Sequence, residues 1–264
     1  MSSSSLPRRN IKLLISYDGT VYSGWQRQGA PGSAGQGIAR ETVQGTIEKA
    51  LEKIHKEAVA LTGSGRTDSG VHAAAQGANF YTHIKSMEDW RFVPALNSLL
   101  PRDIRILDSR ETLEDFHARF DTRQRTYRYF FIYGRDAQPW ELRYAMHLKH
   151  QPDIRLLNSY ARLFRGEMDC TAFAVPGDES KSRSRYISSA SFFLDGSRLV
   201  FEISANAFLW KMVRSIAGTL VHFEEKKIKP GYLGEIISSG MRSMTGPTAP
   251  PEGLFLWKVD YYRE

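Results

Sequence analysis

The chain has 264 residues, of which 41% are hydrophobic and 25% are charged, a composition typical of a globular protein with a sizeable core. Its formal net charge of +7 suits a polyanionic partner such as a nucleic acid. The single cysteine, Cys170, excludes an intramolecular disulfide and a CxxC-type zinc site. The opening MSSSSLPRRN lacks the apolar stretch of a signal peptide, and no apolar run approaches the roughly 18 residues of a membrane span, so we expect a cytoplasmic protein without membrane contact.

The first half of the sequence predicts a loose tail over residues 1–9 and then alternating strands and helices. Expected strands are at 11–17, 58–62, 77–82 and 103–107, and expected helices are at 43–54 and 92–99. Thr42 is the predicted N-cap of the first helix, and Asp18-Gly19 is a turn signal after the first strand. Residues 29–39 are rich in Gly, Pro and Ser, which favours a loop.

The second half repeats this outline without a visible sequence repeat. Expected strands are at 122–133, 189–194, 198–204 and 255–262, and expected helices are at 153–165 and 207–223. Asp195-Gly196 is a strong hairpin signal between two of these strands. Strands joined by short turns and interleaved with helices predict an α+β fold with largely antiparallel sheets. We divide the chain into the tail 1–9, an N-terminal half 10–115 and a C-terminal half 116–264.

The most unusual stretch is GSGRTDSGVHAAAQ (63–76), which places one acid, Asp68, in a Gly-rich loop between Arg66 and His72. Three interpretations are open. Asp68 can cap a turn, with Arg66 as its partner and His72 buried. A metal site is weaker, because a third ligand is not evident and the arginine opposes a cation. In the catalytic interpretation, the neighbouring cation favours the ionised carboxylate, which suits a nucleophile or base and not a general acid.

Other enzyme classes lack their motifs in this sequence. No G-x-S-x-G context surrounds Ser69, which argues against a serine hydrolase, and no G-x-x-x-x-G-K-[ST] sequence for a phosphate-binding loop is present. A glycosidase needs a second, neutral carboxyl group, which the loop does not supply. The glycines of 63–76 allow close approach of a bulky planar substrate. The residues therefore favour an anionic nucleophile or base in a tight, cationic pocket.

GRTDSGVHA closely resembles the signature loop of the tRNA pseudouridine synthase A family, usually written GRTDAGVHA. Further segments resemble the family in the same order along nearly the whole chain. They are YDGTVYSGWQRQ (17–28), TVQGTIEKAL (42–51), FHARFDTRQRTYRYF (116–130), NAFLWKMVRSIAG (206–218) and GLFLWKVDY (253–261). The family isomerises uridine to pseudouridine in the tRNA anticodon arm, at positions 38 to 40, without cofactor or metal. It implies two ferredoxin-like (RRM-like) halves around a central basic active-site cleft, and a homodimer that shares one tRNA.

The resemblance also implies roles for individual residues. Asp68 matches the essential aspartate, described as the nucleophile; attack on C1′ of the ribose and a base role at C2′ both remain open. Arg66 matches the arginine that helps to hold the target nucleotide out of the stack. Tyr127 matches the active-site tyrosine that packs on the uracil, a candidate for proton transfer at C5. Arg214 resembles the basic residue that pairs with the aspartate. We place it on a helical face with Trp210 and Gly218.

Candidate RNA contacts follow from the YxGWQRQ-like segment, in which Trp25, Gln26 and Arg27 sit after the first strand. An indole beside a cation fits RNA contact, and a tryptophan in a loop is about as often a packing anchor. The cations of KSRSRYISS (181–189) are either a path for phosphates or a solvated loop. A protein that binds RNA without catalysis is the competing interpretation, but pure binding does not need Asp68 together with Tyr127 and Arg214.

Overall fold

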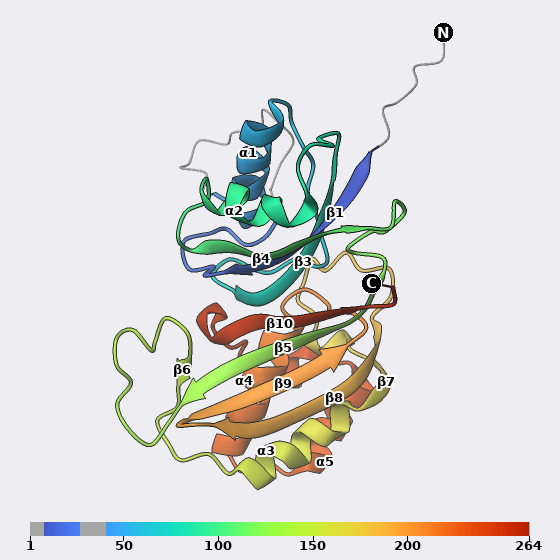
Figure 1. The fold of residues 1–264 in the computed structure, drawn as a ribbon. Helices are drawn as coiled ribbons and strands as arrows, with labels where there is room; N and C mark the ends of the chain where they lie inside the picture. The colour runs from blue at the N-terminus through green and yellow to red at the C-terminus, as the bar shows by residue number, and fades with distance from the viewer. Residues whose placement is uncertain (1–7, 27–40, 264) are drawn as a thin grey trace, which may run out of the picture. The chain divides into compact units, whose positions relative to one another are not determined.

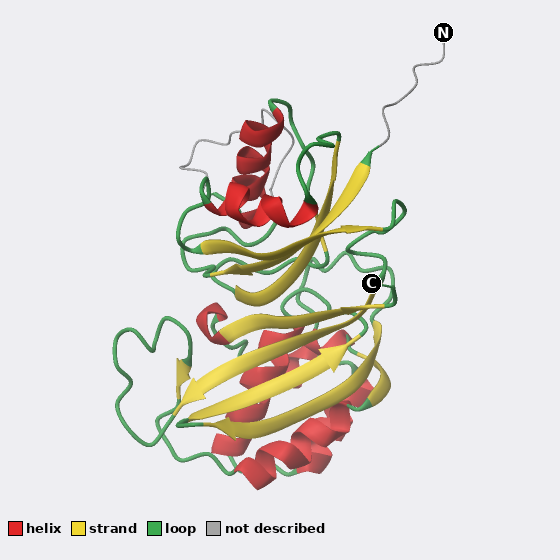
Figure 2. Ribbon diagram, in the orientation of Figure 1, coloured by secondary structure: helices red, strands yellow, loops and turns green. Residues whose placement is uncertain are grey.

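The structure, a computed structural model, describes residues 8–26 and 41–263 and divides into two compact units. The first unit holds the residues up to 123 together with those from 256 onwards, and the second holds 124–255. The chain enters the second unit in β5 (Thr122–Ile132) and returns to the first in β10 (Leu254–Tyr261). Helices and strands are mixed in both units, and the pairing is mostly antiparallel, which confirms the predicted α+β class (Figures 1 and 2).

In the first unit, two helices cover one face of a sheet with the strand order β4-β1-β3-β10 (Figure 1). The elements are β1 (Arg9–Tyr17), α1 (Val43–His55), β2 (Thr62–Gly63), β3 (His72–Thr82), α2 (Phe92–Asn97) and β4 (Ile104–Thr112). β1 pairs antiparallel with both neighbours. Its alternate side chains Ile11, Leu13 and Ile15 are fully buried, so the core of this unit lies between the sheet and the helices.

Helix α1 confirms its predicted start, because Thr42 Oγ1 accepts a hydrogen bond from the Gly45 N–H at 3.2 Å. The strand expected at 58–62 is wrong except for its last residue. The Leu61 N–H donates to Glu48 Oε1 (3.0 Å), and the Leu61 carbonyl accepts from Gln44 Nε2 (2.8 Å). Side chains of α1 thus satisfy the backbone groups that a strand would use, and β2 begins only at Thr62.

In the second unit, three helices lie on one face of a sheet with the strand order β5-β9-β8-β7 (Figures 1 and 2). The other elements are β6 (Met146–His147), α3 (Ile154–Ala161), β7 (Gly166–Asp169), β8 (Ser184–Asp195), β9 (Arg198–Ala205), α4 (Met212–Glu225) and α5 (Pro230–Ser239). The hairpin between β8 and β9 is confirmed, with Gly196 at a φ of +60°. No helix within 8–26 and 41–263 has the length and apolarity to cross a membrane.

A buried carboxylate fixes the end of α4. Glu224 is fully buried and accepts hydrogen bonds from His150 Nε2 (2.5 Å), Lys227 Nζ (2.8 Å) and the Asp153 N–H (3.0 Å). Burial alone would raise the pKa of Glu224, but these three donors lower it below its ordinary value. The charged cluster therefore ties the segment before α3 to the end of α4.

Candidate active site

Asp68 lies in the loop between β2 and β3, and buried hydrogen bonds hold this loop on both sides. Gln76 Nε2 donates to the Gly65 carbonyl (2.9 Å), and Ser64 Oγ donates to Gln76 Oε1 (2.5 Å). Thr67 Oγ1 and the Tyr17 hydroxyl are 2.8 Å apart in the core. Asp68 itself is half-buried, so its carboxylate sits on a loop that buried partners fix in place.

Glycines let the neighbouring chain approach this loop closely. A Cβ on Gly24, whose φ is +94°, would lie 2.4 Å from the Thr67 carbonyl oxygen, and the Trp25 N–H donates to that same oxygen at 3.1 Å. A Cβ on Gly63 would lie 2.4 Å from the Trp25 indole nitrogen, and Gly70 has a φ of +78°. We expected the glycines of 63–76 to make room for substrate. At Gly63 and Gly70, packing and backbone conformation are sufficient reasons for glycine.

His72, the first residue of β3, is a core residue beside this loop. Its side chain is fully buried, and its Nδ1 accepts from the Gly19 N–H at 3.1 Å and lies 3.1 Å from Asp18 Oδ1. A ring nitrogen that accepts a backbone hydrogen bond is already engaged in packing the loop against the turn after β1. Across the described residues, no group of three or more His, Cys, Asp or Glu side chains is placed to hold a metal ion.

Arg66 is exposed, two residues before Asp68 in the same loop. No residue in the described parts of the chain accepts a hydrogen bond from its guanidinium or forms an ion pair with it, so Arg66 does not pair with Asp68. The side chain is thus open to an external anion or a base.

Tyr127 lies on β5 opposite Ile203 of β9 and is 7% exposed. Its ring meets the ring of Phe208 edge-on, with centroids 5.1 Å apart and an interplanar angle of 87°. The neighbouring Thr126 and Ser204 hydroxyls are 2.8 Å apart, which fixes the two strands at this point. The phenol ring of Tyr127 therefore has a firm support on one side.

Arg214 lies in the first turn of α4, and the segment before β10 sets its position. Its Nε donates to the Ala249 carbonyl (2.8 Å), and the Ala249 N–H donates to the Arg214 carbonyl (3.0 Å). A Cβ on Gly218 would lie 2.0 Å from the Pro247 carbonyl oxygen. The small residue one turn after Arg214 thus allows α4 and this segment to touch.

The helix predicted over 207–223 begins only at Met212, because Lys211 is left-handed with a φ of 58°. The Trp210 N–H donates to Asp178 Oδ2 at 2.6 Å and does not enter a helical hydrogen-bond pattern. The spacing predicts that Trp210 shares a helical face with Arg214 and Gly218, and this prediction is wrong because Trp210 lies before the helix. Phe208 packs on Tyr127 and is only half-buried.

The candidate RNA contacts differ in where they lie. Trp25 is 3% exposed and packs on Gly63 and Tyr17, so its indole is a packing anchor and offers no face for stacking. Gln26 is exposed, while Arg27 and the Gly-rich residues 29–39 lie outside the described residues. In the segment 181–189, Arg185 Nη1 donates to the carbonyls of Ser182 and Ser184, at 2.8 and 2.7 Å.

Asp68 and Arg66 belong to the first unit, and Tyr127 and Arg214 belong to the second. The contacts described for these residues lie within their own units.

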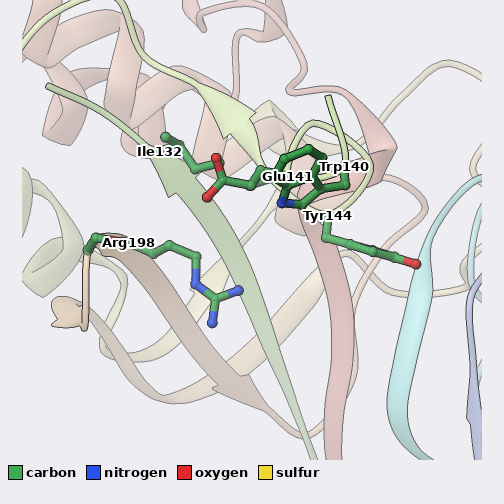
Figure 3. Close-up of a pocket in the computed structure, with 7 residues that line it drawn as sticks. Ile132, Trp140, Glu141, Tyr144 and Arg198 are labelled. Carbon is green, nitrogen blue, oxygen red and sulfur yellow. The ribbon is translucent and has the colours of Figure 1, made fainter. Parts of the chain in front are cut away.

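A pocket of about 260 Å³ in the second unit contains none of the predicted site residues. It is lined by Ile132, Trp140, Glu141, Tyr144, Ala145, Ser197 and Arg198. Figure 3 shows Trp140 and Tyr144 on one side and Arg198 on the other. Two hydrogen bonds from Arg135, at 2.6 and 2.7 Å, lower the pKa of Glu141 to about 2. No sequence motif pointed to this pocket.

Comparison with known proteins covers most of the chain. The family model described as tRNA pseudouridine synthase matches residues 13–121 and 160–262. A tRNA pseudouridine synthase A of Treponema denticola is 52% identical, over 96% of this chain and 93% of its own length. The protein of that name from Treponema pallidum (strain Nichols) is 49% identical, over 90% and 84%. The tRNA pseudouridine synthase A 2 of Clostridium perfringens is 42% identical, over 96% and 100%.

Among solved structures, a chain of a Cbf5-Nop10-Gar1 complex aligns with this protein at 10% sequence identity, and the alignment covers 80% of this chain and 53% of the chain in the complex. Its TM-score of 0.32 is too low to support an inference.

Proposed function

This chain belongs to the tRNA pseudouridine synthase family, and from that premise we propose that it isomerises uridine in the anticodon arm of tRNA with Asp68 as the nucleophile. The observation that carries the proposal is the GRTDSGVHA loop, in which a half-buried carboxylate stands on a backbone that buried partners fix on both sides. A fixed carboxylate suits attack at one carbon, because groups that are already held in the reactive geometry accelerate a reaction most.

The chemistry requires Asp68 to be ionised. As a nucleophile, the carboxylate attacks C1′ of the ribose, the C1′–N1 bond breaks, and the uracil leaves with the bonding electrons. The base then turns, C5 bonds to C1′, and Asp68 is released. The proton on C5 is lost and N1 gains one, so that substrate and product are isomers. Removal of a proton at C2′ by Asp68 is the alternative first step, and it needs the same ionised carboxylate.

The other site residues act around this step. Tyr127 packs against the uracil and is a candidate for proton transfer at C5, with Phe208 supporting its ring. Arg214 pairs with Asp68, and its hydrogen bond to Ala249 orients the guanidinium. Arg66 helps to hold the target nucleotide out of the stack, where a planar cation can fill the vacated space. Of the three candidate RNA contacts after the first strand, Gln26 and Arg27 remain candidates and Trp25 does not.

The same family membership supports the larger architecture that we propose. Apart from the short strands β6 and β7, the chain order is β5-α3-β8-β9-α4, and β9 lies between β5 and β8 in the sheet, which fits a ferredoxin-like half. The halves 10–115 and 116–264 would then enclose a basic cleft. We also propose a cytoplasmic homodimer that binds one tRNA.

The test is tritium release from tRNA labelled at C5 of uridine, combined with mapping of the modified positions. Tritium release with pseudouridine at positions 38 to 40 supports the proposal. Pseudouridine in another arm would overturn the choice of anticodon arm. Binding of tRNA without any tritium release would favour an RNA-binding protein without catalysis.

A further inference from the structure

The segment between β9 and α4 exposes an aromatic side chain beside a cation. Trp210 is 47% exposed, and Lys211 Nζ lies 4.6 Å from the centre of its ring. Lys211 also has the positive φ of 58° that a residue other than glycine adopts rarely. The segment thus presents a large aromatic ring and a cation together at the surface of the second unit.

The backbone of Trp210 is anchored, and a glycine lies close to its ring. The backbone N–H of Trp210 donates to Asp178 Oδ2 (2.6 Å), and Asp178 Oδ1 accepts from the Ser180 N–H (2.9 Å). Gly177 lies under the indole, since a Cβ there would be 3.6 Å from Trp210 Cζ3. The exposed indole therefore projects from an anchored backbone and lies against the Gly177 main chain.

The start of the same segment is fixed as well. Asn206 Oδ1 accepts from the Tyr186 and Ala207 N–H groups, at 3.1 and 2.8 Å, and its carbonyl accepts from Arg125 Nη1 at 2.9 Å. Tyr186 is itself 56% exposed. Two exposed aromatic residues, Tyr186 and Trp210, and two half-buried cations, Arg125 and Lys211, thus belong to or contact a short, well-anchored turn.

This turn also carries residues of the candidate active site. Phe208, two residues before Trp210, packs edge-on against Tyr127, and Arg214 follows Lys211 by three residues in the first turn of α4. Trp210 is therefore close, along the chain, to Phe208, which supports Tyr127, and to Arg214.

We propose that Trp210 and Lys211 form a binding site for one unpaired nucleotide of the substrate tRNA other than the target uridine. The indole stacks on the base, and the Lys211 ammonium moves from the ring to that nucleotide's phosphate. Aromatic rings combined with cations are the usual means of binding single-stranded nucleic acid, because every base has a face that stacks. The inference rests on the proposed function, because it takes tRNA as the substrate.

The experiment compares tRNA binding and turnover for Trp210→Ala, Trp210→Phe and Lys211→Ala. Trp90→Ala is the matched control, because Trp90 is 55% exposed and also lies beside a cation, Arg91, 5.2 Å from its ring. We expect Trp210→Ala to raise the Kd and the KM for tRNA about tenfold, with a far smaller fall in kcat, and Trp210→Phe to restore most of the affinity. Lys211→Ala should lower the slope of log Kd against log salt by about 0.7.

Equal affinity of Trp210→Ala, Trp90→Ala and the wild type would overturn the proposal. If Trp210→Ala does not fold, as seen in its far-UV circular dichroism, quenching of indole fluorescence by tRNA decides. Quenching that is smaller in Trp210→Phe than in the wild type supports the site, and equal quenching overturns it. Failure of the proposed function gives a different result: the wild type then releases no tritium, whatever effect the Trp210 substitutions have on tRNA binding.

Discussion

Replacing Gly218 by alanine tests the contact that positions Arg214. The added Cβ would lie 2.0 Å from the Pro247 carbonyl oxygen and 2.7 Å from the Ala249 nitrogen. Both atoms belong to the backbone and cannot rotate away, so α4 and the 247–249 segment must separate by about 1 Å. That separation also weakens the two hydrogen bonds between Arg214 and Ala249.

The expected cost follows from three contributions. Overpacking of this kind costs roughly 1–3 kcal/mol, and each weakened hydrogen bond costs up to about 1 kcal/mol. The higher helix propensity of alanine returns about 1 kcal/mol. We therefore expect Gly218→Ala to lower the free energy of unfolding by about 2–3 kcal/mol, which lowers Tm by roughly 4–12 °C. The displaced Arg214 should also reduce kcat.

The measurement is urea unfolding followed by far-UV circular dichroism, with Gly234→Ala as the matched control. Gly234 is also helical, in α5, but a Cβ there meets nothing within 4 Å. The control should therefore gain up to about 1 kcal/mol from helix propensity alone. If Gly218→Ala proves as stable as Gly234→Ala, the close contact and the reasoning built on it are refuted.

Three further substitutions give expected outcomes of different kinds. Thr42→Ala removes the N-cap of α1 and should lower the free energy of unfolding by about 1 kcal/mol, measured by the same urea titration. Glu224→Gln should destabilise the second unit by about 2–4 kcal/mol at pH 7. Since the native pKa of Glu224 is lowered, the stabilisation by its carboxylate is present above the unfolded pKa and is lost as the pH falls through the native pKa. The difference in free energy of unfolding between the variant and the wild type should therefore shrink below about pH 4. A constant difference from pH 7 to pH 3 would contradict that linkage. Arg66→Ala should lower kcat/KM for tRNA more than tenfold with no change in the urea midpoint, because the exposed side chain has no partner in the described residues; a shifted midpoint would indicate a structural role.

Local sequence signals predict an element correctly where residues close in the sequence determine its structure. Helix α1 begins at its predicted cap, because the Thr42 side chain meets a donor three residues away. The β8–β9 hairpin turns at Asp195-Gly196, because Gly196 accepts a positive φ that other residues resist. In both places the relevant contact is local and can be read from a few residues.

Distant contacts explain the differences. The apolar pattern of 207–223 is helical, yet Trp210 hydrogen-bonds to Asp178, 32 positions earlier, and α4 starts later than its pattern predicts. The strand predicted at 58–62 does not form because side chains of α1 make hydrogen bonds to the Leu61 backbone N–H and carbonyl. Trp25 is a core residue because Gly63 leaves room for its indole. None of these partners can be identified from the local sequence.

The candidate site divides in the same way. The motif around Asp68 identifies the acid, and the structure adds why its loop is fixed, through Tyr17, Thr67 and Gln76. The supports of the other site residues, Phe208 behind Tyr127 and Ala249 beside Arg214, come from other parts of the chain and were not predicted.

The central claim is that Asp68 carries out the reaction, and the most direct test is single-turnover tritium release by Asp68→Asn. Ser69→Ala is the control, since Ser69 is next to Asp68 and, among the described residues, its hydroxyl donates only to the Tyr22 carbonyl, at 3.1 Å. We predict that Asp68→Asn releases no tritium above background while its Kd for tRNA stays within a few-fold of wild type, and that Ser69→Ala keeps its activity. Near-normal turnover by Asp68→Asn would contradict the account.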